Sequence, residues 1–101
     1  MRDDNDYSSM GRRELRQHLE RVSKEVAVWS QSASVARRDE CLYYVDGVQN
    51  SRGKSTTERK LDGEMHAAEL KREALEAEGY VSFYAALRDL LVTLLRTAEA
   101  D

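Results

Sequence analysis

The chain has 101 residues, of which 41% are hydrophobic and 35% are charged, and its formal net charge is −3. This length accommodates a single domain, and the mixture of 16 basic with 19 acidic residues excludes the strongly basic surface of a duplex-DNA-binding protein. With five glycines, no proline and 7% aromatic residues, the composition also disfavours a β-sandwich, which needs many turns.

The first part of the chain predicts one long helix. Residues 1–8 are polar and are expected to be frayed. Ser8 or Ser9 is then expected to accept a hydrogen bond at the start of the helix. Apolar residues at alternating spacings of four and three follow, and this pattern predicts a helix from about residue 9 to about residue 45. The members of this stripe are Leu15, Leu19, Val22, Val26, Trp29, Ala33 and Ala36.

Residues 46–54 form a break rich in glycine, serine and asparagine. Gly47 is expected to end the first helix in a left-handed conformation. The run Ser55-Thr56-Thr57-Glu58 is typical of a capping box and predicts the start of a second helix, from about residue 55 to about residue 98. Gly79 lies inside it and is interpreted as clearance for a large residue opposite. A second stripe follows that helix: Ala77, Tyr80, Tyr84, Leu87, Leu91, Leu94 and Ala98.

Two helices joined by a short break predict an all-α fold, a long antiparallel two-helix hairpin of the coiled-coil type, with residues 9–101 as its single domain. Folding the chain back at the break places Leu15 near Leu87 and Ala36 near Met65. The ring of Trp29 is then expected to face Arg72.

The last stretch of the second helix is too apolar for two helices to bury. Its large side chains extend over far more than one stripe, and leaving several of them in water would favour association. We expect a homodimer in which the C-terminal halves form a four-helix bundle, with a heterologous protein partner as the alternative. The residues expected to carry self-association are Tyr80, Tyr84, Leu87, Leu91 and Leu94.

The break is also the most basic part of the chain, with Arg52, Lys54, Arg59 and Lys60 close together. These residues are candidates for contact with a polar partner, either nucleic-acid phosphate or an acidic protein surface; the alternative is an ordinary solvated loop. The segment from Arg52 to Ser55 resembles the end of a phosphate-binding P-loop. The glycine spacing and the lack of a preceding strand argue against that interpretation.

No residues predict a catalytic, cofactor-binding or metal-binding site, and the chain is not expected to be an enzyme. His18 and His66 are expected to lie too far apart along the hairpin to share a metal ion. The lone Cys41 excludes an internal disulfide and is interpreted as a reduced thiol. The N-terminus lacks the pattern of a signal peptide, and the apolar stretch from Tyr80 is too short and too charged to span a bilayer. We therefore expect a cytoplasmic protein.

The second half of the chain resembles small, mostly uncharacterised helical-hairpin proteins encoded by tailed bacteriophages. The resemblance rests on the Ser-Thr-Thr-Glu-Arg-Lys start at residues 55–60 and on Ala-Ala-Leu-Arg-Asp-Leu-Leu at residues 85–91. It implies a non-catalytic adaptor or accessory protein that acts in the cytoplasm of the host cell. Because such proteins are often encoded near recombination or replication genes, it also implies an alternative, accessory binding of single-stranded nucleic acid.

Overall fold

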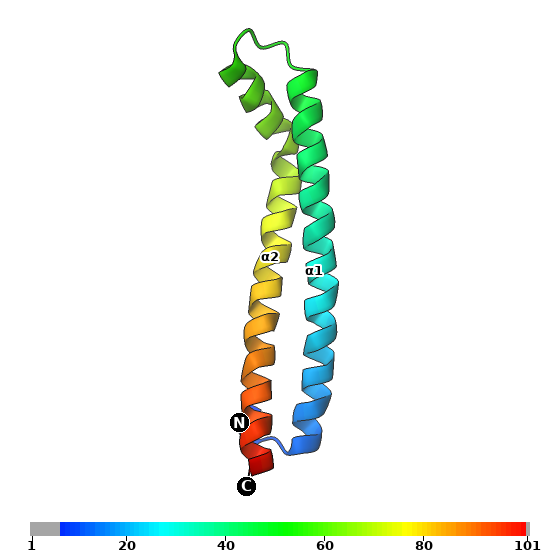
Figure 1. Cartoon of the computed structure of the whole chain (residues 1–101), viewed down its shortest axis with the longest axis vertical. Coiled ribbons are helices and arrows are strands. Elements are labelled where there is room, and N and C mark those ends of the chain that lie inside the picture. The colour runs from blue at the N-terminus through cyan, green and yellow to red at the C-terminus, as the bar shows by residue number, and fades with distance from the viewer. Residues whose placement is uncertain (1–6, 101) are drawn as a thin grey trace, which may run out of the picture. The chain divides into compact units, whose positions relative to one another are not determined.

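The computed structural model describes residues 7–100. A short 3₁₀ turn, η1 (Tyr7–Ser9), precedes two long helices, α1 (Arg12–Gln49) and α2 (Thr56–Ala100). The two helices run in opposite directions (Figure 1). The predicted all-α helical hairpin is therefore confirmed, although α1 both begins and ends later than its predicted range.

The start of α1 differs from the prediction. The Leu15 N–H donates to the carbonyl of Gly11 at 3.0 Å, so Gly11 occupies the N-cap position instead of Ser8 or Ser9. Upstream, the Met10 N–H donates to the Tyr7 carbonyl at 3.2 Å and closes η1. Tyr7 is only 6% exposed, so it belongs to the core and not to a frayed end. The rest of the predicted frayed segment, residues 1–6, lies outside the described residues.

The predicted helix end at Gly47 is wrong, because α1 continues through it to Gln49. No described glycine has a positive φ. Gly47 instead lies where the two helices approach each other closely: a Cβ there would be 2.9 Å from the Gly63 Cα and 2.8 Å from the His66 Cβ. Asn50 follows the last residue of the helix, and its side-chain amide donates to the carbonyl and the carboxylate of Asp46, both at 2.9 Å.

The predicted capping box at the start of α2 is present in modified form. The Glu58 N–H donates to the Ser55 hydroxyl at 3.1 Å, as such a box requires. The Glu58 carboxylate, however, accepts from the N–H of Lys54, one residue before the expected Ser55. Both interactions are local, which is why the sequence located this helix start well.

The contacts divide the chain into two compact units. We call residues 7–28 with 80–100 the end unit, and Trp29–Gly79 the loop unit. The end unit contains a core of large side chains, in which Leu91 is fully buried and Leu15 and Val22 are nearly so. Tyr7 completes the buried set, and partly buried residues pack around it: Met10, Leu19, Tyr84, Leu87, Leu94 and Leu95.

The interior of the loop unit consists of small residues. Buried alanines come from both helices, and Gly63 is buried with them; the alanines are Ala33, Ala36, Ala67, Ala74 and Ala77. Two of the expected neighbours are wrong: Met65 is 68% exposed instead of packed on Ala36, and Trp29 borders a groove with Glu73 and Ala77 instead of facing Arg72. Because α1 ends at Gln49 instead of about residue 45, these positions of α1 meet residues further along α2 than the sequence suggested, as the Arg37–Glu78 pair also shows.

Candidate interaction surfaces

The residues predicted to carry self-association lie mostly inside the end unit. Leu91 is 0% exposed, and Tyr84, Leu87 and Leu94 pack against the same cluster. Tyr80 alone of the five is exposed. The apolar tail of α2 is thus partly covered within one chain, with Tyr7 and Met10 among the side chains that cover it. Other large side chains of this unit face outward: Val28, Phe83 and Leu90.

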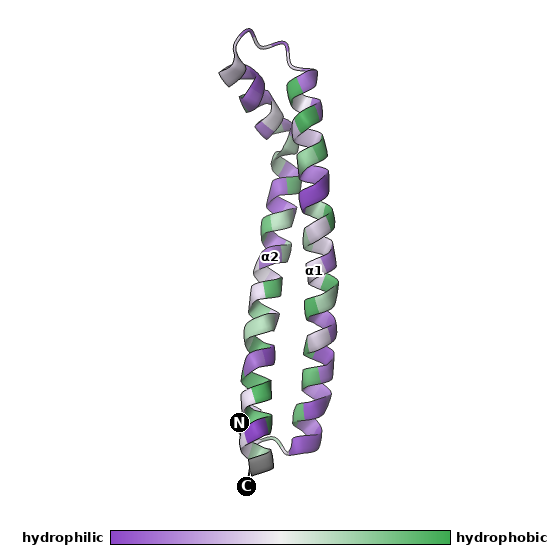
Figure 2. Ribbon diagram, viewed as in Figure 1, coloured by the Kyte–Doolittle hydropathy of each residue, from purple (hydrophilic) through white to green (hydrophobic). Residues whose placement is uncertain are grey.

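The loop unit exposes more of its large apolar side chains than the end unit does. Hydrophobic positions occur along both helices (Figure 2), but the buried residues of this unit are alanines and Gly63. The larger side chains therefore point outward, on α1 and on α2. They are Val35, Leu42, Tyr43, Val45, Leu61, Met65 and Leu75. Exposed apolar area of this kind marks an interaction surface more often than an inert one.

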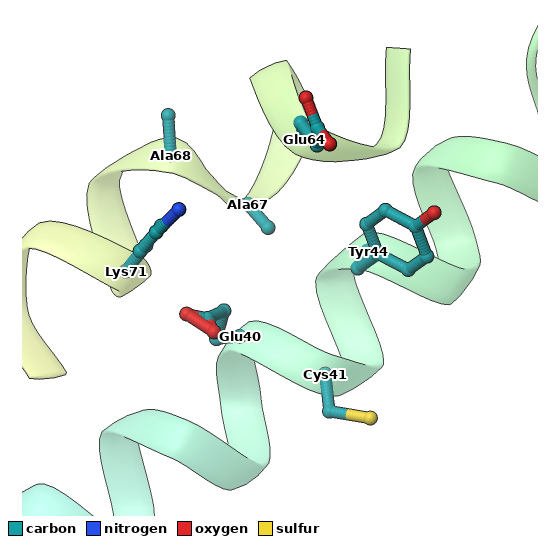
Figure 3. Close-up of a pocket in the computed structure, with 7 residues that line it drawn as sticks. All are labelled: Glu40, Cys41, Tyr44, Glu64, Ala67, Ala68 and Lys71. Carbon is teal, nitrogen blue, oxygen red and sulfur yellow. The ribbon is translucent and has the colours of Figure 1, made fainter. Parts of the chain in front are cut away.

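A groove of about 450 Å³ runs between the two helices of the loop unit. Tyr44 lines it from α1, and Ala67 and Ala68 line it from α2. Figure 3 shows Glu40 extending from α1 toward α2, while the thiol of Cys41 points away from α2; Lys71 lines the groove from α2. The groove is lined mainly by carbon, with charged groups at its edges. Such a surface can accept an apolar side chain or a helix from another protein.

A charged cluster joins the helices of the loop unit. The Arg37 guanidinium donates to both carboxylate oxygens of Glu78, at 2.5 and 3.1 Å, and also to Glu40 at 3.0 Å. The hydrogen bond from Arg37 lowers the pKa of Glu78, and the same contact raises the pKa of Arg37. All three side chains are partly solvated, so this cluster fixes the alignment of the helices more than it adds stability.

The basic loop residues do not form one uniform site. Arg59 donates to the Gly53 carbonyl at 3.1 Å and so braces the loop. Arg52, Lys54 and Lys60 are exposed, and within the described part of the chain their side chains form no hydrogen bond or ion pair. Next to these cations, the Ser55 hydroxyl accepts from the Glu58 N–H of α2, and the Glu58 carboxylate accepts from the Lys54 N–H, so a carboxylate already lies at the start of this helix.

The two histidines belong to different units. The Arg21 guanidinium donates to the His18 Nδ1 at 3.0 Å, and the His18 ring packs edge-on against Tyr7. His66 lies 3.1 Å from the Asp46 carboxylate and stacks on Tyr43. Across residues 7–100, no group of three or more histidine, cysteine, aspartate or glutamate side chains is arranged to hold a metal ion.

Neither helix, over its described residues, has a stretch that is long and apolar enough to cross a bilayer. Comparison of the chain with protein-family models, with curated proteins and with solved structures found no match.

Proposed function

We propose that this protein is a non-catalytic protein–protein interaction module, a helical hairpin whose exposed apolar surface is covered by another protein molecule. One observation supports the proposal: large apolar side chains such as Met65 and Phe83 are exposed, at 68% and 60%, while much of the interior is alanine. A hairpin that needed only to fold would be more stable with those side chains inside.

The phage-type accessory role remains part of this proposal, and so does a cytoplasmic site of action. The first rests on the resemblance of residues 55–60 and 85–91 to phage hairpin proteins. The second rests on the mixed surface charge and the lone, exposed Cys41, which suits a reducing compartment.

An affinity experiment with matched baits tests the interaction function. The wild-type chain is compared with a variant that carries Leu42→Glu, Leu61→Glu and Phe83→Glu, since these three side chains are more than half exposed and lie outside the core. We expect the wild type to retain a protein, a second copy of itself included, that the variant does not retain. Identical retention by both baits, together with a monomeric wild type, would overturn the proposal.

Binding of single-stranded nucleic acid is a second candidate, favoured by one observation. Arg52 and Lys54 on the loop and Lys60 near the start of α2 are three exposed cations with no partner among the described residues. If they bind phosphate, affinity for a labelled oligonucleotide should fall steeply with salt and should be lost when the three become glutamate. Arg59→Glu is unsuitable for this test because it would also break the brace to Gly53. Equal binding by parent and triple variant would exclude this candidate.

A further inference from the structure

One flank of α2 in the loop unit carries a second apolar stripe that the hairpin does not use. Leu61, Met65, Ala68 and Leu75 are all exposed, and their spacings of four, three and seven residues place them on the same side of the helix. Ala68 also lines the groove described above. The stripe therefore runs beside the groove, and Leu61 and Leu75, 54% and 53% exposed, lie at its two ends.

The residues of the stripe are arranged almost symmetrically before and after Ala68. Leu61 lies seven residues before it and Leu75 seven residues after it. Glu64 lies four residues before Ala68, and Arg72 four residues after it. A two-fold axis through Ala68 would thus set leucine level with leucine and carboxylate level with guanidinium, with the small Ala68 side chains at the point of closest approach.

The charges distinguish between the two possible directions of a second helix. In an antiparallel pair about Ala68, Glu64 of one copy meets Arg72 and, one residue away, Lys71 of the other. In a parallel pair Arg72, which lies on the stripe, would face Arg72 of the other copy, and Glu64 would lie beside Glu69 of the other copy; both contacts are repulsive. The charge pattern therefore favours a second copy in the antiparallel orientation.

The groups needed for these contacts are available. Among the described residues, neither Glu64 nor Lys71 forms a hydrogen bond or an ion pair within its own chain, and both border the groove. Arg72 is held by Glu69 at 2.6 Å and by Glu76 at 3.7 Å, but these are exposed pairs within one helix and are weak. Lys71 is therefore the main cation offered to Glu64 of a partner.

We propose that the Leu61–Leu75 flank of α2 binds the same flank of a second copy of this chain, antiparallel and two-fold symmetric about Ala68, with Glu64 of each copy beside Lys71 of the other. This inference rests on the proposed interaction function and names its partner. It places the contact in the loop unit, whereas the sequence pointed to the tail of α2.

Sedimentation equilibrium of the full chain over about 1 to 100 μM, a range in which dimers of moderate affinity are measured, tests the apolar part. We expect the wild type to dimerise, and the variant with Leu61→Glu and Leu75→Glu to bind itself about a hundredfold more weakly or not at all. Leu42→Glu is the matched control: it changes an equally exposed leucine on α1 that does not line the groove, and it should leave the dimer unchanged.

A charge exchange tests the orientation. Glu64→Lys and Lys71→Glu, made singly, should each weaken the dimer about tenfold, because each replaces two attractive contacts by repulsive ones. The double variant restores opposite charges across an antiparallel interface and should regain the wild-type affinity. Failure of the double variant to recover would overturn the antiparallel arrangement. Helix content measured by circular dichroism confirms that each variant is folded, since all these side chains lie outside the core.

The remaining outcomes separate this inference from the function on which it rests. A wild-type chain that stays monomeric over the whole range, or a dimer that survives the Leu61→Glu and Leu75→Glu changes, overturns the proposed α2 interface. The interaction function itself fails only if, in addition, the two baits of the affinity experiment retain the same proteins. Retention of a different protein by a monomeric chain would support the function and overturn the homodimer.

Discussion

The end unit and the loop unit belong to the same two helices, yet they are packed by different means. In the end unit, large side chains such as Leu15 and Leu91 fill the space between the helices. In the loop unit, alanine and Gly63 fill it, and the backbones approach closely at Gly47. Small residues permit that approach but bury little apolar area. The contrast teaches that the loop unit leaves more large apolar side chains exposed. Binding of a partner would therefore bury more apolar area there than at the end unit.

The largest loss of stability should come from a substitution that leaves a cavity in the core of the end unit. Leu91→Ala removes a side chain that is 0% exposed, and we expect the free energy of unfolding to fall by about 3 kcal/mol. Leu90→Ala is the matched control, since the neighbouring leucine is 46% exposed and should cost less than about 1 kcal/mol. Urea denaturation followed by circular dichroism measures both. Equal decreases in the free energy of unfolding for the two variants would show that burial of Leu91 does not stabilise the core.

A smaller effect is expected in the loop unit. There, replacing Gly63 by alanine should lower the free energy of unfolding, although alanine has the higher helix propensity. A methyl group at Gly63 would lie 2.6 Å from the Val48 Cγ2 and 2.9 Å from the Tyr44 carbonyl oxygen. Overlap of this kind costs about 1–3 kcal/mol, against a gain of about 1 kcal/mol from replacing glycine within a helix. Gly63→Ala should therefore lower the free energy of unfolding by about 1 kcal/mol in a urea titration. A more stable variant would mean that the helices separate easily at this point.

The same substitution should have the opposite effect at the other interior glycine of α2. A Cβ at Gly79 would have no atom within 4 Å, so the interpretation of this glycine as clearance for a large residue is wrong. Gly79→Ala should raise the midpoint of thermal unfolding, because it adds about 0.4–1 kcal/mol of stability. Loss of stability here would indicate a contact at Gly79 that the structure does not contain.

The smallest effect concerns the ion pair of the loop unit and depends on pH. Because Arg37 lowers the pKa of Glu78 below its ordinary value of 4.5, the folded state binds this proton less readily than the unfolded state does. The contribution of Glu78 is therefore complete above pH 4.5 and is lost as the pH falls further. Glu78→Gln should lower the thermal midpoint slightly at neutral pH, and the difference from wild type should shrink below pH 4.5. Asp89→Asn, which alters an exposed carboxylate with no ion pair among the described residues, should show no such convergence.

Features determined by neighbours in the sequence were predicted well. The Ser55 cap depends on residues within four positions, and the inward stripe of α1 depends on helical period alone; Leu15, Val22, Ala33 and Ala36 are buried as expected. The hairpin itself follows from the same two signals.

Features determined by residues far along the chain were predicted poorly. A glycine serves equally well to end a helix or to admit a neighbouring backbone, and only the presence of Gly63 opposite Gly47 decides between the two. The burial of Tyr7 was hidden by its polar surroundings in the sequence. The stripe from Leu61 to Leu75 was not predicted, because only one apolar face was expected on each helix, and a helix that packs through alanine can have a second apolar face.

Hydrogen bonds hold the connection between the helices at both Ser51 and Lys54. Ser51 donates to Asp62 and accepts from the Gly53 N–H, and the Lys54 N–H donates to Glu58. Trypsin must draw a substrate into an extended strand, so cutting after Arg52 or Lys54 requires these bonds to open first. This turn, although exposed and rich in cleavable residues, is thus a poor place to nick the chain or to insert an epitope.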